Sequence, residues 1–170
     1  MKNNNYVLPT SFIVHLLAII FVIIQLSSFS IDNFARIIPS LDIMIIFYFW
    51  FIRKTYGLFF IFFLGLWHDA IIGNILGVTS LSYILTIKFF EIIDNRLFSK
   101  EGFVNICYQF IAFCAVIFML KWLLLGIFNN NLADVKILLI NWVLTILLYI
   151  VMHGFFDFLS EKMPEDASRY

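Results

Sequence analysis

The sequence predicts an all-α membrane protein, built as one bundle of about six transmembrane helices with both termini in the cytoplasm. Of the 170 residues, 63% are hydrophobic and only 13% are charged, and the mean hydropathy is +1.00. A soluble domain carries roughly a quarter charged residues, so membrane lipid is the expected solvent of this chain. The charged residues gather between apolar runs, as membrane loops place them. The net charge of zero offers no basic face for a nucleic acid.

Six apolar segments are predicted to cross the membrane within a single domain, residues 1–170. They lie at residues 12–29, 37–52, 55–72, 75–93, 103–128 and 135–158, and a polar tail follows at 160–170. A helical crossing needs about 20 apolar residues. The intervals between the segments are too short for a soluble domain of useful size.

The first segment is interrupted only by His15 and Gln25, and we expect an uncleaved helix there rather than a signal peptide. The second segment is the shortest, because Asp42 and Arg53 enclose only ten residues. It completes an even number of crossings if Arg53 extends toward the interface, and a re-entrant or interfacial helix is the alternative. Pro39 suits the start of this helix, where its missing N–H costs nothing.

The third and fourth segments are together too long for one crossing, and Gly73-Asn74 is the turn signal between them. A tight hairpin is predicted there. The fifth segment carries Lys121, whose side chain is expected to extend outward to the interface. Cys107 and Cys114 in the same segment would lie about 10 Å apart along a helix, too far for a disulfide.

Basic residues are unevenly distributed between the two sides of this topology. With the N-terminus inside, the cytoplasmic side collects eight of the eleven, namely Lys2, Arg53, Lys54, Lys88, Arg96, Lys100, Lys162 and Arg169. The outer side collects the other three, Arg36, Lys121 and Lys136. Cytoplasmic loops carry an excess of Lys and Arg, so this distribution predicts that both termini are cytoplasmic.

A regular series of small and polar residues follows the start of the third segment. Gly65, Asp69, Gly73 and Gly77 are four residues apart, and Gly57 precedes them. Glycines at such positions let helices approach closely. We therefore predict a packing seam, or a site that receives a partner's helix, although Gly77 lies beyond the turn and is not assumed to share one face with the others.

Asp69 is expected to have a specific use, because a carboxylate within a membrane segment is costly. Near the end of the hairpin, it either faces water, caps the fourth segment, or makes a polar contact with another helix or a partner. The neighbouring His68 points about 100° away on a helix, and no further His or Asp cluster completes a metal site. His153 and Asp157 are four residues apart and are expected to pair on one helix face. No catalytic, cofactor-binding or metal-ligating residues are predicted.

Two stretches carry a resemblance to a known family. The first is Arg36-Ile37-Ile38-Pro39-Ser40-Leu41-Asp42. The second begins with Gly57-Leu58-Phe59-Phe60 and continues with Gly65-Leu66-Trp67-His68-Asp69-Ala70-Ile71-Ile72-Gly73-Asn74-Ile75-Leu76-Gly77-Val78-Thr79-Ser80-Leu81. Both stretches resemble the bacterial rod shape-determining protein family MreD. The first resembles the Pro-containing entry to the second helix of that family. The second resembles the family pattern G-l-x-x-D-x-x-x-G-x-x-x-G-x-x-x-L. The likeness covers about residues 36–90, and the remainder agrees in length and hydropathy.

The resemblance implies a non-enzymatic scaffold of the bacterial inner membrane that serves the cell-elongation machinery. The implied partners, besides membrane lipids, are an MreC-like bitopic protein, an MreB-like filament system and the synthases of lateral peptidoglycan. It also implies a fold similar to the substrate-binding subunits of energy-coupling-factor transporters. His68 is not a hallmark of the family.

Two alternative functions follow from the same segments. A solute-binding subunit of an energy-coupling-factor transporter would dock through an Ala-x-x-x-Ala pair in its first helix, whereas here Ala18 is followed by Val22. A lipid-handling membrane enzyme would need a catalytic set of residues, and the sequence presents none. A scaffold is therefore the favoured function.

Overall fold

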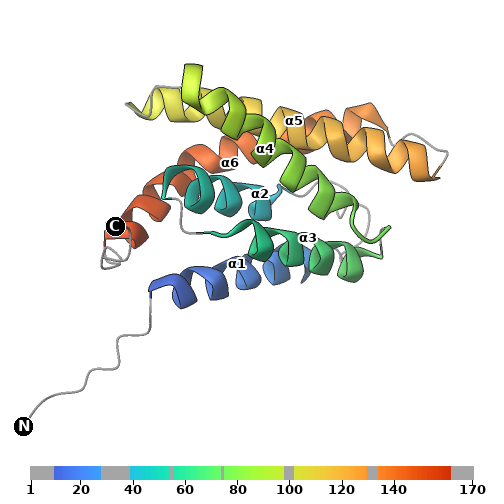
Figure 1. The fold of residues 1–170 in the computed structure, drawn as a ribbon, viewed down its shortest axis with the longest axis horizontal. Helices are drawn as coiled ribbons and strands as arrows, with labels where there is room; N and C mark the ends of the chain where they lie inside the picture. Colours follow the sequence, from blue (N-terminus) through green and yellow to red (C-terminus); the bar gives the residue numbers. More distant parts are fainter. Residues whose placement is uncertain are drawn as a thin grey trace, which may run out of the picture.

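The computed structural model shown in Figure 1 describes residues 10–27, 39–53, 56–73, 75–97, 102–129 and 134–161. Every element formed by these residues is a helix, which confirms the all-α class. The elements are α1 (Thr10–Ser27), α2 (Leu41–Ile46), η2 (Phe47–Ile52), α3 (Leu58–Ile72), α4 (Val78–Leu97), α5 (Phe103–Asn129) and α6 (Val135–Glu161).

The helices form two layers with one helix enclosed between them (Figure 1). α1 and α3 lie side by side in one layer, and α5 and α6 form the other. α2 continues directly into the π-helix η2, and α2 contacts both α1 and α6. α4 crosses between the layers, packing on α3 and on α5. Successive helices run in alternating directions, so α1, α3 and α5 begin at the end of the bundle where α2, α4 and α6 finish.

The enclosed second helix is the centre of the hydrophobic core. The side chains from Asp42 to Phe49 are all buried, and none is more than 1% exposed. The helix begins at Leu41 with Ser40 as its N-cap, four residues after the predicted start of the segment at residue 37, which lies outside the described residues. Pro39 accordingly precedes the cap instead of occupying the first turn. The helix runs for about 18 Å, short of the roughly 30 Å hydrocarbon layer, and its neighbours surround it in place of lipid.

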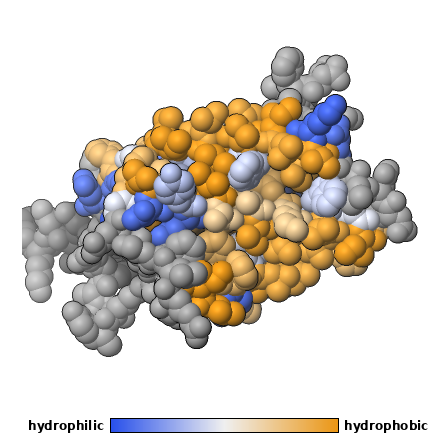
Figure 2. Space-filling view, turned by 90° about the horizontal axis from the view of Figure 1, so that it is seen from above, coloured by the Kyte–Doolittle hydropathy of each residue, from blue (hydrophilic) through white to orange (hydrophobic). Residues whose placement is uncertain are grey.

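Among the described helices, α5 and α6 have the length and the apolar character that a membrane crossing requires. Phe103–Phe128 and Val135–Leu159 are long and apolar enough to cross a membrane, and His15–Gln25, Leu41–Ile52 and Leu58–Ile72 are shorter apolar helices. Figure 2 shows a broad hydrophobic surface on the described part of the chain, with hydrophilic residues mainly toward its two ends. These features are those of a helical membrane protein.

The turn between α3 and α4 lies where the sequence predicts it. α3 ends at Ile72, and Gly73 adopts a left-handed conformation with φ of 75°. Its N–H donates to the carbonyl oxygen of Asp69 at 3.0 Å, which closes the end of the helix. Gly77 also has a positive φ, 97°, so α4 starts three residues later than predicted. Asn74 lies outside the described residues.

Of the five residues in the predicted packing series, one glycine makes a close helix contact. A Cβ at Gly65 would lie 2.6 Å from Ser80 Cα on α4. The Ser80 hydroxyl donates to the carbonyl oxygen of Phe62 at 2.8 Å and reinforces this contact. At Gly57, Gly73 and Gly77 a Cβ would meet nothing within 4 Å. A continuous seam within the chain is therefore wrong, because the last two glycines serve the turn and Gly57 is the extended N-cap of α3.

Replacing Gly65 with Ala should destabilise the protein. The added methyl group meets the backbone of Ser80, and overpacking of this kind costs about 1–3 kcal/mol. The free energy of unfolding, measured by SDS titration in mixed micelles, should fall accordingly. Gly154→Ala on α6 is the matched control, since a Cβ there meets nothing within 4 Å. Equal losses from the two substitutions would contradict the close contact.

Candidate functional site

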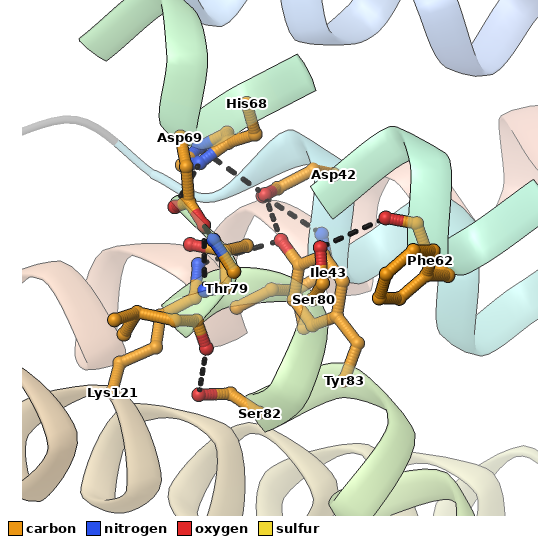
Figure 3. A network of polar contacts seen from close by, with 12 residues as sticks. Asp42, Ile43, Phe62, His68, Asp69, Thr79, Ser80, Ser82, Tyr83 and Lys121 are labelled. Carbon is orange, nitrogen blue, oxygen red and sulfur yellow. Dashed lines mark hydrogen bonds and ion pairs between the residues drawn. The ribbon is translucent and has the colours of Figure 1, made fainter. Parts of the chain in front are cut away.

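A cluster of buried polar side chains joins four helices beside the α3–α4 turn (Figure 3). It consists of Asp42 on α2, His68 and Asp69 on α3, Tyr83 on α4 and Lys121 on α5. The first four are at most 5% exposed. Ionisable residues inside a membrane bundle are rare and pair with one another, so this cluster is the candidate site. We refer to these five residues as the polar cluster.

Asp69 holds the start of α4 through its carboxylate. Its Oδ2 accepts hydrogen bonds from the backbone N–H groups of Gly77 at 2.9 Å and Thr79 at 3.0 Å. Thr79 lies in the first turn of α4 and Gly77 directly precedes it, and at a helix start orphan N–H groups and the helix dipole favour a negative charge. Capping of the fourth segment is therefore confirmed. The water-facing alternative is wrong, because Asp69 is 0% exposed.

Asp42 is the second carboxylate of the polar cluster. Its Oδ2 accepts a short hydrogen bond from the Tyr83 hydroxyl, and its Oδ1 accepts one from the N–H of Ile43 at 2.9 Å. The backbone N–H of Asp42 donates to Gln25 Oε1 on α1 at 3.3 Å. Reasoning from the sequence missed Asp42, which it treated as a segment boundary. The feature of the sequence that indicates a buried role for Asp42 is the position of this carboxylate within an otherwise apolar run.

Lys121 points into the bundle, which makes the predicted outward direction wrong. Its Nζ donates to the Tyr83 hydroxyl at 3.4 Å and lies 4.9 Å from the centre of the Tyr83 ring. Lys121 also interacts electrostatically with Asp42 and Asp69. Two buried carboxylates attract an ammonium strongly in a medium of low dielectric constant, and this attraction outweighs the alternative of reaching the interface.

His68 lies between the two carboxylates. Its Nε2 is 3.5 Å from Asp42 Oδ2, and its Nδ1 is 4.0 Å from Asp69 Oδ1. The imidazole thus lies between α2 and α3 at one edge of the polar cluster, with a carboxylate beside each ring nitrogen (Figure 3). Within the described ranges, no group of three or more His, Cys, Asp or Glu side chains could hold a metal ion.

A second polar array ties η2 to α6. His153 Nε2 lies 3.4 Å from Asp157 Oδ2, which confirms the predicted pair. Asp157 Oδ1 accepts a hydrogen bond from the Tyr48 hydroxyl at 2.5 Å. Tyr149 OH is 3.2 Å from His153 Nδ1, and the Tyr149 ring stacks on Phe110 with 3.7 Å between centroids. The array anchors the aromatic π-helix η2 to α6 through the Tyr48–Asp157 hydrogen bond.

Three further residues from the sequence analysis, His15, Cys107 and Cys114, lie among the described helices. The His15 ring packs edge-on against the rings of Tyr56 and Phe60, with centroid distances of 5.2 and 4.2 Å. Cys107 and Cys114 are free thiols, as their spacing predicts. These side chains take part in helix packing and lie apart from the polar cluster, except for Cys114, which interacts electrostatically with Asp42.

Removing the Asp69 carboxylate should destabilise the α3–α4 hairpin and lower the free energy of unfolding. Asp69→Ala leaves the N–H groups of Gly77 and Thr79 without their acceptor. The cost is about 1–3 kcal/mol for the buried Thr79 amide and less for the part-buried Gly77 amide. Asp69→Asn keeps one carbonyl oxygen at the same place and should lose less. Unfolding in SDS titrations measures both.

The control for this substitution is Asp134→Ala. Asp134 Oδ1 accepts a hydrogen bond from the N–H of Lys136 at the start of α6, in an exposed position. Water replaces an exposed acceptor, so this variant should lose about 1 kcal/mol or less. The capping assignment fails if Asp69→Asn and Asp69→Ala destabilise the protein to the same extent.

Comparison with known proteins agrees with the resemblance in the sequence. The family model for the rod shape-determining protein MreD matches residues 2–159. An uncharacterized protein of Rickettsia prowazekii (strain Madrid E) is 28% identical over 156 residues, which cover 92% of this chain and 88% of that protein. No solved structure matches the chain. The family match spans all six helices, and the chain therefore belongs to the MreD family of rod shape-determining membrane proteins.

Proposed function

We propose that this member of the MreD family is a non-enzymatic, multi-pass scaffold of the bacterial inner membrane. Its partners would be an MreC-like bitopic protein, an MreB-like filament system and the synthases of lateral peptidoglycan. The observation that carries the proposal is that the buried polar side chains join helices of this chain to one another. Asp42, Asp69 and Lys121 hold helices of this chain together, while the outer helix faces present apolar side chains.

A scaffold of this kind meets its partners through exposed helix surfaces. The outer face of α3 presents a large apolar residue at every fourth position, namely Phe59, Phe63, Trp67 and Ile71. Association of helices in lipid depends on packing and on small residues that permit close approach. Because Asp69 is fully buried, it would support docking by fixing the hairpin and would not itself touch a partner.

The tip of the α3–α4 hairpin is the docking element that we favour. Gly73 and Gly77 leave open space around their Cα atoms, and between them Ile75 and Leu76 are exposed. The hydrogen bond from Gly77 to Asp69 fixes the Gly77 side of this tip, which reduces the entropy lost on binding. Gly57 is also open at the start of α3 and would offer a second site of close approach.

The alternative of a solute-binding transporter subunit is not proposed. The docking positions of the first helix in that class correspond here to Ala18 and Val22. Both side chains are buried inside this chain, so they are unsuited to docking another subunit.

Leu76→Ser should weaken co-purification with the MreC-like partner by about tenfold, equivalent to about 1.4 kcal/mol. Leu76 is 66% exposed, so its replacement leaves the fold intact while removing an apolar contact. Ile127→Ser is the matched control, because Ile127 is equally exposed at the same end of the bundle. Rod shape should be impaired by the first variant and retained by the second. Undiminished association of Leu76→Ser would remove the hairpin tip from the proposal.

Reporter fusions at the two ends of the chain test the proposed orientation. The excess of basic residues at one side of the alternating helices favours cytoplasmic placement of both termini. A fused cytoplasmic reporter should be active, and a periplasmic reporter inactive, at each end. Activity of the two reporters at opposite ends would exclude an even number of crossings.

A further inference from the structure

The imidazole of His68 faces a carboxylate with each of its two ring nitrogens. Nε2 lies 3.5 Å from Asp42 Oδ2, and Nδ1 lies 4.0 Å from Asp69 Oδ1. The His68 side chain is only 6% exposed. Neither ring nitrogen forms a hydrogen bond within the described part of the chain, and the same is true of Asp69 Oδ1. Three buried polar atoms therefore converge at one place with their bonding capacity unused.

The number of protons on the ring decides whether this arrangement is favourable. A neutral imidazole carries one N–H and one nitrogen lone pair. Either neutral form would turn its lone pair toward a carboxylate oxygen, because a carboxylate lies on both sides of His68. A ring that carries both protons instead directs an N–H toward each carboxylate. The geometry is thus complementary to the doubly protonated ring.

The charges of the surrounding helices point to the same state. Asp42 from α2 and Asp69 from α3 face His68 directly. Tyr83 from α4, and Lys121 and the Cys114 thiol from α5, interact with one or both of these carboxylates. Two carboxylates thus oppose one ammonium. Unbalanced charge in a buried, membrane-embedded cluster is costly, and one additional proton brings the polar cluster to zero net charge.

We propose that the polar cluster is a proton-binding site, in which His68 holds a second ring proton and bridges Asp42 and Asp69 as an imidazolium. The lone pair of the ring takes up one proton from water, and no other bond changes. Release of that proton would leave one carboxylate facing a lone pair and would loosen α2 from the α3–α4 hairpin. The proton site is formed entirely by groups of this chain, so its occupancy can be measured without a partner.

Nitrogen NMR of the full chain in lipid nanodiscs tests the site directly. The protein contains three histidines, so labelling with ¹⁵N-histidine gives few signals, and loss of one set in His68→Gln identifies those of His68. At neutral pH, both ring nitrogens of His68 should show the shifts of an imidazolium. His15 and His153 serve as references in the same spectrum. A neutral tautomer at His68 in the unaltered protein would overturn the proposal, whatever the variants show.

Variants test whether the imidazolium of His68 depends on the two carboxylates or only on burial of the ring. Asp42→Asn removes one carboxylate, so the imidazolium signals should be lost and the signals of a neutral tautomer should replace them. Lys121→Met removes the competing cation and should leave the imidazolium in place. Lys136→Met, an exposed lysine at the start of α6, is the control for loss of a positive charge and should change nothing. Retention of the imidazolium in Asp42→Asn would also contradict a site shared by two carboxylates.

Discussion

The hydrogen bonds from Gly77 and Thr79, at the start of α4, to Asp69 are the constraint on which the rest of the structure depends. They reach back from one helix to the end of the preceding helix and fix both sides of the hairpin at once. Gly65 can then approach the Ser80 backbone closely, and Tyr83, on the same helix, comes to lie against Asp42. A single carboxylate thus determines how α3, α4 and α2 meet. In lipid, where water offers no competing hydrogen bonds, such a cap is especially effective.

The enclosed second helix shows how this small membrane protein forms a core. Lipid is as apolar as leucine, so burial of aliphatic side chains alone gives little preference for one packing. The aromatic side chains of the π-helix η2 select one packing arrangement instead, through specific ring–ring contacts. The Phe47 ring contacts those of Phe51, Phe110, Phe113 and Tyr149, with centroids 5.2 to 5.7 Å apart. Aromatic pairs at such distances contribute about 0.5–1.5 kcal/mol each. Polar contacts at both ends of the helix then fix its position along the bundle.

The sequence predicts well those features that depend on neighbouring residues. The helical class, the turn at Gly73 and the His153–Asp157 pair follow from hydropathy, from a turn residue and from spacing on one helix. The polar cluster depends on residues 41 and 38 positions apart in its Asp42–Tyr83 and Tyr83–Lys121 contacts. Periodicity carries no information over such separations. Lys121 was expected to reach the interface because its buried partners are on other helices.

The contacts of the second helix with α6 have a consequence for synthesis of the chain. Ser40 donates its N–H to Thr145 Oγ1 over a separation of 105 residues, and Tyr48 reaches Asp157 over 109. A ribosome therefore delivers the partners of the second helix last, after every other helix has left the tunnel. Until then the second helix is held by its earlier partners on α1, α4 and α5 and lacks the hydrogen bonds to α6. Completion of the final helix is thus the step that closes the enclosure of the second helix, and a chain truncated before it leaves Tyr48 and the Ser40 N–H without their partners.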